Sequence, residues 1–203
     1  GRPVGELKIV TCHMGNGSSI AAVAGGKSVD TSLGFSTVPG ILMGTRAGDL
    51  DPVMILHLME QEGISPKAMS HILHKESGVL GISGISSDLR DIEEAASTGN
   101  ERATLALEML CYGVRKYIGA YAAAMGGLDA VVFTAGIGEN SVLVRQMVSE
   151  GLEFLGAKID IAKNNIRGKE AIVSTDDSSV KILVVPTNEE LVIARDTRTL
   201  VNG

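Results

Sequence analysis

Three glycine-rich stretches carry the residues of this sequence that are best suited to chemistry on a phosphate group. The first, residues 134–140, reads Thr-Ala-Gly-Ile-Gly-Glu-Asn and follows the largely apolar run 129–133. That run predicts a buried strand, and the residues after Asn140 predict a helix that ends at Gly151. Glycines between a strand and a helix N-terminus allow backbone N–H groups and the helix dipole to face an anion. A tight turn that requires glycine explains the same spacing equally well, because G-x-G alone is a weak signal.

The second stretch is Gly15–Ser19, which follows His13 at the end of a predicted strand, 7–13. Two further strands are predicted at 20–24 and 28–31, and the Asn-Gly and Gly-Gly pairs between the three runs indicate hairpins. A three-stranded antiparallel meander therefore opens the chain. Its first turn is either an ordinary hairpin turn or a loop whose N–H groups and hydroxyls surround a phosphate. The histidine before it and the serines after it favour the second interpretation.

The third stretch surrounds Arg46, which lies between Gly44 and Gly48. An arginine in this irregular segment is poorly placed for core packing and well placed to reach a ligand. The alternative is a surface ion pair with Asp49 or Asp51, which would contribute little to stability.

A carboxylate, Glu189, follows the last predicted strand, 180–185. Ligands of open α/β sheets collect at the C-terminal ends of parallel strands, so Glu189 and Gly136 are expected at the same edge. An acidic residue at the start of the terminal helix also has an ordinary role as a partner of the helix dipole.

The remaining segments predict helices that position these stretches. Asp51-Pro52 indicates a helix start, with helices expected at 52–63, at 66–76 and around 91–96 after a Gly/Ser-rich loop, 81–90. Thr98-x-x-Glu101 has the form of a capping box for a long helix to about Met125. Residues 159–180 are polar with a turn at 176–179. The resulting β-β-β-α-β-α-β order is that of a ribonuclease H-like α/β fold.

Composition excludes several classes of protein. The chain has 203 residues, 44% of them apolar, with 25 glycines, no tryptophan and a net charge of -6. Scarce aromatic residues and the acidic balance argue against nucleic-acid binding. Cys12 and Cys111 lie in apolar segments, which predicts buried thiols, and no Cys/His cluster suggests zinc. Without a signal peptide or an apolar run of membrane-spanning length, we expect a cytoplasmic protein with no membrane partner. The first residue is Gly1, so we expect a fragment.

The motifs together resemble the acetate kinase (acetokinase) family, specifically its C-terminal nucleotide-binding half. The resemblance covers the whole chain, so residues 1–203 are expected to form one ribonuclease H-like lobe of the actin, Hsp70 and sugar kinase superfamily, with the N-terminal acyl-binding lobe absent. It rests on Cys12–Gly17, Asp30–Phe35, Met43–Asp49, Lys75–Gly78, Val132–Asn140 and Pro186–Glu190.

The resemblance implies a reversible, direct phosphoryl transfer from ATP to acetate that gives acetyl phosphate and ADP and requires Mg²⁺. It implies that His13 contacts the transferring phosphoryl group, that Arg46 neutralises its charge, and that Glu189 holds the metal. It also implies a homodimer that forms through this lobe. The implied nucleotide-binding residues are Asn16, Gly17, Asp88, Leu89, Arg90, Gly136, Ile137 and Asn140.

The sequence departs from the family pattern at Met14, at Ala47 and in the loop 35–39, and no departure removes a functional side chain. The absent lobe is the serious gap, since the resemblance places a catalytic aspartate, a second arginine and the acyl pocket there. The isolated chain is therefore expected to be inactive. Two alternatives stay open: half of a propionate or butyrate kinase, and a non-catalytic nucleotide-binding module that dimerises through the helix carrying Tyr117 and Tyr121. A dinucleotide-binding oxidoreductase is disfavoured because no full G-x-G-x-x-G follows the first strand.

Overall fold

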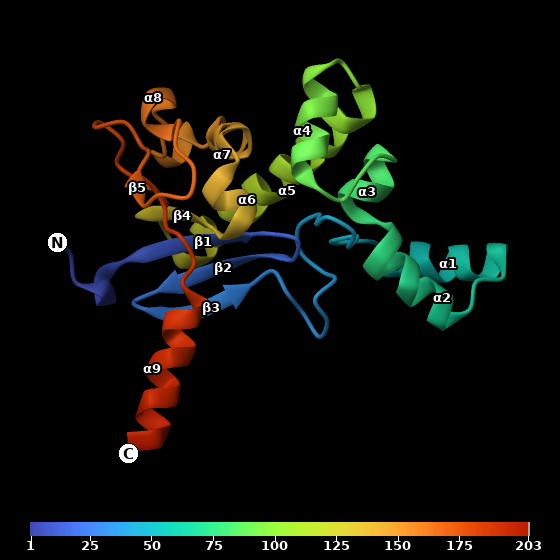
Figure 1. Cartoon of the computed structure of the whole chain (residues 1–203), viewed down its shortest axis with the longest axis horizontal. Coiled ribbons are helices and arrows are strands. Elements are labelled where there is room, and N and C mark those ends of the chain that lie inside the picture. The colour runs from blue at the N-terminus through green and yellow to red at the C-terminus, as the bar shows by residue number, and fades with distance from the viewer. Residues whose placement is uncertain (203) are drawn as a thin grey trace.

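A mixed β-sheet forms the centre of the computed structural model, which describes residues 1–202 except for the side chains of Glu189 and Asn202 (Figure 1). Within these residues the sheet has six strands in the order β3-β2-β1-β4-β6-β5. The first three strands form an antiparallel meander, while β1, β4 and β6 run parallel. The strands are β1 (Lys8–Met14), β2 (Ser18–Ala24), β3 (Lys27–Thr31), β4 (Ala130–Thr134), β5 (Ala171–Ile172) and β6 (Lys181–Val184).

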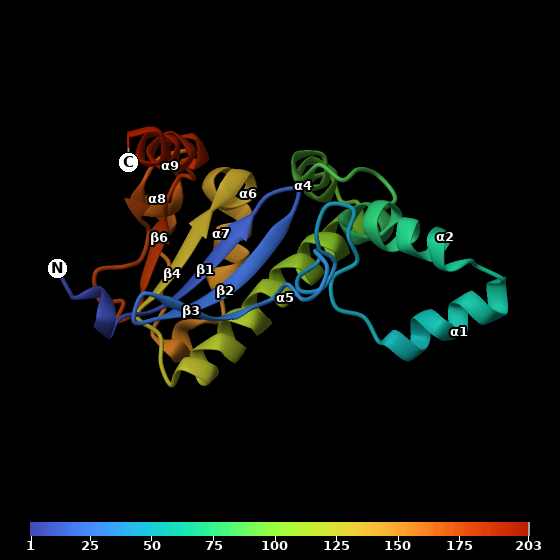
Figure 2. The same cartoon turned by 90° about the horizontal axis from the view of Figure 1, so that it is seen from below.

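The helices follow the predicted order along the chain. They are α1 (Pro52–Glu62), α2 (Pro66–His71), the π-helix η2 (Ile72–Glu76), α3 (Gly78–Ser83), α4 (Leu89–Ser97), α5 (Glu101–Met125), α6 (Ala135–Asn140), α7 (Val142–Ser149), α8 (Ile161–Asn164) and α9 (Glu189–Asn202), with short 3-10 helices at Val4–Glu6 and Glu153–Leu155. Both views show α1 and α2 as an arm beside the body, and Figure 1 shows α9 pointing away from the sheet (Figures 1 and 2).

The core lies between the sheet and α5. Alternate residues of β1 are buried, as expected for a strand with one covered face, and α5 contributes a buried stripe that includes Leu107, Leu110 and Val114. Cys12 and Cys111 are free, buried thiols, as predicted. This core fixes the meander and the parallel strands as one unit, so the strand ends keep a defined geometry. No helix within the described residues is long and apolar enough to cross a membrane.

Several local predictions need correction. The capping box at Thr98 is wrong: Asn100 caps α5 by accepting a hydrogen bond from Ala103 N, and the Thr98 hydroxyl donates back to the Ala95 carbonyl of α4. The predicted 81–90 loop begins inside α3, which ends at Ser83 with Gly84 in the left-handed region. The polar segment 159–180 holds the short elements α8 and β5, which the sequence prediction missed.

The glycines of residues 134–140 lie inside a short helix that the sequence did not predict, α6, and the predicted helix follows them as α7. The turn from β4 into α6 takes place at Ala135, whose φ is 63°. Among the described non-glycine residues it alone has a positive φ, a conformation that costs energy for a residue with a Cβ. The chain therefore reverses within one residue at the end of the strand.

Two of the three tyrosines of α5, Tyr117 and Tyr121, face inward, whereas Tyr112 is exposed. Tyr121 is buried, and Tyr117 packs on it edge to face with ring centroids 5.6 Å apart. The Tyr117 hydroxyl donates a 2.6 Å hydrogen bond to Asp49 Oδ2. Burial and this hydrogen bond raise the pKa of Tyr117 above its usual value. The pair links α5 to the segment that carries Arg46.

Candidate functional site

A polar cavity of about 450 Å³ lies at the C-terminal edge of the parallel strands. His13 enters it from the end of β1, where it is half-buried and pairs in register with Thr134 of β4. Gly136 and Glu139 reach it from α6, and the segment after β6 closes its other side. The cavity therefore gathers residues from three neighbouring strand ends, which is where ligands of open α/β sheets bind. Its lining is His13, Ala135, Gly136, Glu139, Thr187, Asn188 and Glu190.

Hydrogen bonds from Thr187 and Glu139 hold the two sides of the cavity together. Thr187 Oγ1 lies 2.8 Å from Thr134 Oγ1 and accepts a 3.1 Å bond from Ala135 N. Thr187 N in turn donates to Glu139 Oε1 at 2.9 Å. These contacts fix Ala135, the residue with positive φ at the start of α6, between β4 and the segment after β6.

The first hairpin turn holds the second group of predicted residues. Gly15 N donates to Gly17 O and to the hydroxyl of Ser18, which keeps the turn tight and leaves Asn16 exposed. A Cβ on Gly17 would lie only 3.1 Å from Arg46 Nη1, so the guanidinium covers the glycine directly. The turn and Arg46 therefore meet.

Arg46 does not form the surface ion pair considered as an alternative. Within the described residues its side chain makes no ion pair, and Nη1 donates to Thr37 O at 3.3 Å. Asp49 is engaged by Gly40 N and by the α5 tyrosine, and Asp51 caps α1. In the part of the chain that the structure describes, Nε and Nη2 make no hydrogen bond, so the guanidinium keeps donors available for a ligand.

The loop that carries Arg46 is fixed through its backbone. Ser77 N, Val79 N and Leu80 N donate to three successive loop carbonyls at 2.8–3.0 Å. Gly78 allows this approach: its φ is +67°, and a Cβ there would lie 2.3 Å from Met43 O and 2.9 Å from Arg46 N. The position of the arginine is therefore set by the start of α3.

Gly44 joins the hairpin turn to the start of α4. A Cβ on Gly44 would lie 2.8 Å from Asn16 Oδ1 and 3.0 Å from Ser87 O, so both segments contact this glycine. Asp88 follows and caps α4, accepting from Arg90 N at 2.9 Å. Hydrogen bonds from the Arg90 side chain and backbone lower the pKa of Asp88 to about 2. The guanidinium is largely exposed, and Leu89 is buried in the core.

The predicted residues of α6 differ in their surroundings. Gly136 is exposed with open space around its Cα, whereas Ile137 packs against the core. Asn140 Nδ2 donates to Gly136 O at 2.8 Å and closes this short helix on itself. The next residue, Ser141, donates a short hydrogen bond to Glu93 of α4. The ends of α6 and α4 are therefore connected, which brings the two predicted groups onto adjoining elements.

Sequence reasoning missed two groups of residues. Thr187 and Glu139 hold the cavity together. Both lie close in sequence to predicted site residues, Glu189 and Gly136, and this proximity could have identified them. Arg145 of α7 is fully buried and donates to Gly138 O, a contact that no local pattern indicates. Its acceptors lie on other segments, so only the tertiary structure reveals it.

The predicted metal-binding residue, Glu189, is the first residue of α9, and its side chain lies outside the described part of the structure. Its neighbours Asn188 and Glu190 line the cavity together with Glu139, so the donors at this edge are oxygen atoms. Among the described residues, no group of three or more His, Cys, Asp or Glu side chains is arranged to hold a metal.

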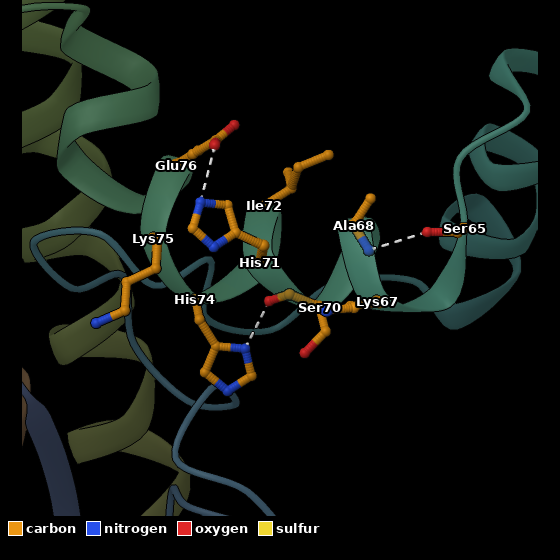
Figure 3. A pocket seen from close by; sticks show the side chains of 9 residues that line it. All are labelled: Ser65, Lys67, Ala68, Ser70, His71, Ile72, His74, Lys75 and Glu76. Carbon is orange, nitrogen blue, oxygen red and sulfur yellow. Dashed lines mark hydrogen bonds and ion pairs between the residues drawn. The ribbon is translucent and has the colours of Figure 1, made fainter.

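A larger hollow of about 860 Å³ runs along α2 and η2 (Figure 3). There His71 Nε2 lies 3.1 Å from Glu76 Oε1, and His74 Nδ1 lies 2.7 Å from Ser70 O. None of the residues predicted to act on phosphate lines it.

The fold and the cavity define a ribonuclease H-like α/β lobe with a polar site at the carboxyl edge of its parallel strands. A sequence model of the acetokinase family matches residues 1–195. The chain belongs to the acetokinase family.

Known relatives extend this finding. The chain is 64% identical over 201 residues to an acetate kinase of Carboxydothermus hydrogenoformans and 60% identical over 200 residues to one of Alkaliphilus metalliredigens. These alignments cover 99% and 98% of this chain and 50% of each relative. The chain therefore spans about half the length of the curated relatives it matches.

Solved structures give the same result. The crystal structure of Porphyromonas gingivalis acetate kinase superposes with a TM-score of 0.94 at 52% identity, over 97% of this chain and 50% of that one. A propionate kinase from Francisella tularensis superposes with a TM-score of 0.87 at 39% identity, over 93% and 48%.

Proposed function

We propose that this chain is the nucleotide-binding half of an acetate kinase, which transfers the γ-phosphoryl group of ATP directly and reversibly to acetate. One observation carries the proposal: His13, Gly136 and the segment after β6 line one cavity, while Arg46 covers the adjoining hairpin turn. The names of the relatives, acetate kinase, support the reaction class.

His13 and Arg46 are the proposed catalytic residues. Phosphoryl transfer has a loose, in-line transition state, so catalysis consists mainly of positioning and of stabilising charge on the transferring oxygens. A planar guanidinium matches those oxygens in pairs, which a lysine ammonium does not. The fixed backbone of the Arg46 loop supports this role because it limits the reorganisation needed during reaction.

The proposed nucleotide site runs from the hairpin turn to α6. Asn16 and Gly17 would hold phosphates, where the turn leaves its outer face open. The start of α4 would line one side of the adenosine, and α6 would line the other; the hydrogen bond between Ser141 and Glu93 supports their pairing. The residues proposed for the two sides are Asp88, Leu89 and Arg90, and Gly136, Ile137 and Asn140.

The oxygen donors at the cavity edge fit Mg²⁺, which prefers carboxylate, amide and water oxygens. We assign Glu189 as the residue that holds it, through waters, with the nucleotide phosphates completing its coordination. When bound, Mg²⁺ would neutralise phosphate charge. Glu139 is already engaged by Thr187 N and so belongs to the frame of the site rather than to the metal.

Residues 1–203 would form one complete lobe and only half of an active site. The lobe that would bind the acyl group lies outside this chain, so we expect nucleotide binding without phosphorylation of acetate. The likeness to a propionate kinase favours one alternative, in which the acceptor is a longer acid. Activity of the full-length protein on acetate, propionate and butyrate decides this; a preference for a longer acid would overturn the acetate assignment.

We further propose a cytoplasmic homodimer that assembles through this lobe. Tyr121 is buried and Tyr117 is half-buried, so we place the interface on Leu105, Met109 and Tyr112, which are exposed on the same helix. Sedimentation of the chain tests this, and a monomer at high concentration would count against it. A dimer without nucleotide binding would favour the non-catalytic module.

Calorimetric titration with MgADP tests the nucleotide site. Gly136→Val adds a side chain into open space, so it should block the ligand without disturbing the fold. Gly119→Val is the matched control, because Gly119 is also a helical glycine with no neighbour within 4 Å, on α5. Arg46→Ala should keep most of the affinity, since the arginine acts on the transition state.

The expected result is binding by the parent chain, Gly119→Val and Arg46→Ala, with at least a tenfold loss in Gly136→Val. Equal affinity in Gly136→Val and Gly119→Val would place the nucleotide elsewhere. Absence of binding by the parent chain would remove the proposal that this lobe binds nucleotide on its own.

A further inference from the structure

Arg145 is a buried arginine whose hydrogen-bond partners are all uncharged. Its side chain is fully buried in α7, and within the described residues no carboxylate pairs with it. Nε donates to Asn164 Oδ1 at 2.7 Å, Nη1 to Gly138 O at 2.9 Å, and Nη2 to Asn164 O and Ile166 O at 2.9 and 2.8 Å. Every nitrogen of the guanidinium is therefore used, and each acceptor is a neutral oxygen.

Such an arrangement is costly to build. A buried charge without a counter-ion is strongly disfavoured, and a buried apolar side chain of similar size would fill the same space without that penalty. Burial lowers the pKa of Arg145 to about 10, and the nearby charge of Arg167 acts in the same direction. The guanidinium still carries its charge at neutral pH. The site therefore requires the donors of an arginine, not merely its volume.

The Arg145 side chain joins α6 to residues 164–166. Gly138 belongs to α6, and its Cα lies so close to β4 that a Cβ would be 3.2 Å from the carbonyl carbon of Phe133. Asn164, fully buried at the end of α8, also donates to Val142 O. Gly168 N adds a 3.2 Å bond to Glu139 O. Arg145 thus clamps α6 between β4 and residues 164–168.

We propose that Arg145 is a positioning residue that fixes α6 in the geometry the nucleotide requires. The inference rests on the proposed function, because Gly136, Ile137 and Asn140 of α6 are the residues assigned to the adenosine. A helix of six residues closed by its own Asn140 cannot hold its orientation alone, since isolated helices of this length are not stable. Thr187 holds the start of α6, and the clamp at Gly138 fixes its centre.

The test compares Arg145→Lys with the parent chain. Lysine keeps the positive charge but has one nitrogen in place of three. Its donors therefore cannot form the bonds to Gly138 O and to residues 164–166 all at once. Arg115→Met is the matched control: Arg115 Nη1 donates to Glu150 O at the opposite end of α7, again to a carbonyl, without contacting α6. Asn164→Ala is a milder second variant: it removes the acceptor for Nε and the Asn164 bond to Val142 O, but keeps the backbone carbonyl that accepts from Nη2.

Two measurements separate positioning from general stabilisation. Amide hydrogen exchange of residues 135–141 in the ligand-free chain should speed at least tenfold in Arg145→Lys and about threefold in Asn164→Ala, with exchange in the centre of α5 unchanged. The Kd for MgADP should rise at least tenfold in Arg145→Lys and about threefold in Asn164→Ala. Arg115→Met should change neither by more than twofold.

Unchanged exchange and unchanged Kd in a folded Arg145→Lys chain would overturn the inference. If that variant does not fold, Asn164→Ala carries the test with the same two readouts, and faster exchange with an unchanged Kd would also overturn it. A parent chain that does not bind MgADP contradicts the proposed function instead. In that case, faster exchange of α6 in the variants still supports the clamp, and unchanged exchange refutes it.

Discussion

Replacing Gly78 by alanine should displace the loop that carries Arg46, and the cost follows from the contacts of that glycine. Its φ of +67° alone costs a residue with a Cβ about 1–2 kcal/mol. The new carbon would also lie 2.3 Å from Met43 O, a backbone atom that cannot move without breaking hydrogen bonds. Three such bonds join the loop to residues 77–80, each worth about 1 kcal/mol. We therefore expect a loss of about 4 kcal/mol.

Gly84→Ala is the matched control for this prediction. Gly84 ends α3, as Gly78 begins it, and has nearly the same φ, +69°, but nothing lies within 4 Å of its Cβ position. Only the conformational cost of about 1–2 kcal/mol should remain. Urea denaturation of both variants measures the difference, expected at about 3 kcal/mol. In a chain of this size each kcal/mol lowers Tm by about 2–4 °C, so the Tm values should differ by roughly 6–12 °C. Equal stabilities would refute the argument that Gly78 supports the loop.

Three further predictions concern single side chains. Tyr117→Phe removes the hydrogen bond to Asp49 and should cost about 1–2 kcal/mol of unfolding free energy in urea denaturation at pH 7. Asp88 has a folded pKa of about 2, below its unfolded value, so its stabilising contribution is complete above about pH 4 and lost as the pH falls toward 2. Asp88→Asn should therefore flatten the fall in stability across that window, measured by denaturation at several pH values; an unchanged profile would contradict this. Burial raises the thiol pKa of Cys12 and Cys111, so both should react with a disulfide reagent at pH 8 at least a hundredfold more slowly in the folded chain than in denaturant.

The sequence predicted the parts of the fold that depend on local signals. The Asn-Gly and Gly-Gly pairs at 16–17 and 25–26 are sufficient to indicate the meander, and Gly25 and Gly26 adopt the positive φ that a two-residue hairpin turn favours. The N-terminus of α5 shows where prediction from the local sequence fails. Thr98 and Asn100 are both residue types that favour an N-cap. The Thr98 hydroxyl donates a hydrogen bond to Ala95 O of α4, and Asn100 therefore caps α5.

The parts that were missed depend on contacts between distant segments. The strand β5 has only two residues, Ala171 and Ile172, which pair with Val184 and Leu183 of β6. A strand of two residues is too short to show an alternating pattern of apolar and polar residues. Arg145 resembles a surface arginine in a helical pattern, and its acceptors lie 19 and 21 residues further along. The site prediction included His13 and Gly136, which line the cavity. It failed to include Thr187, whose role depends on the distance to Ala135.

The pairing of β1 with β4 also constrains how the chain acquires its structure. Lys8 N bonds to Asp129 Oδ2 across 121 residues, so the two central strands can associate only after a very long loop closes. The meander needs only local contacts and can form early, whereas closing that loop is slow. During synthesis at about 5–20 residues per second, β1 would wait roughly 6–24 s for β4 to emerge. Until then the edge of β1 that later pairs with β4 has no partner strand, so this edge, which carries His13, is open to misassociation in the nascent chain.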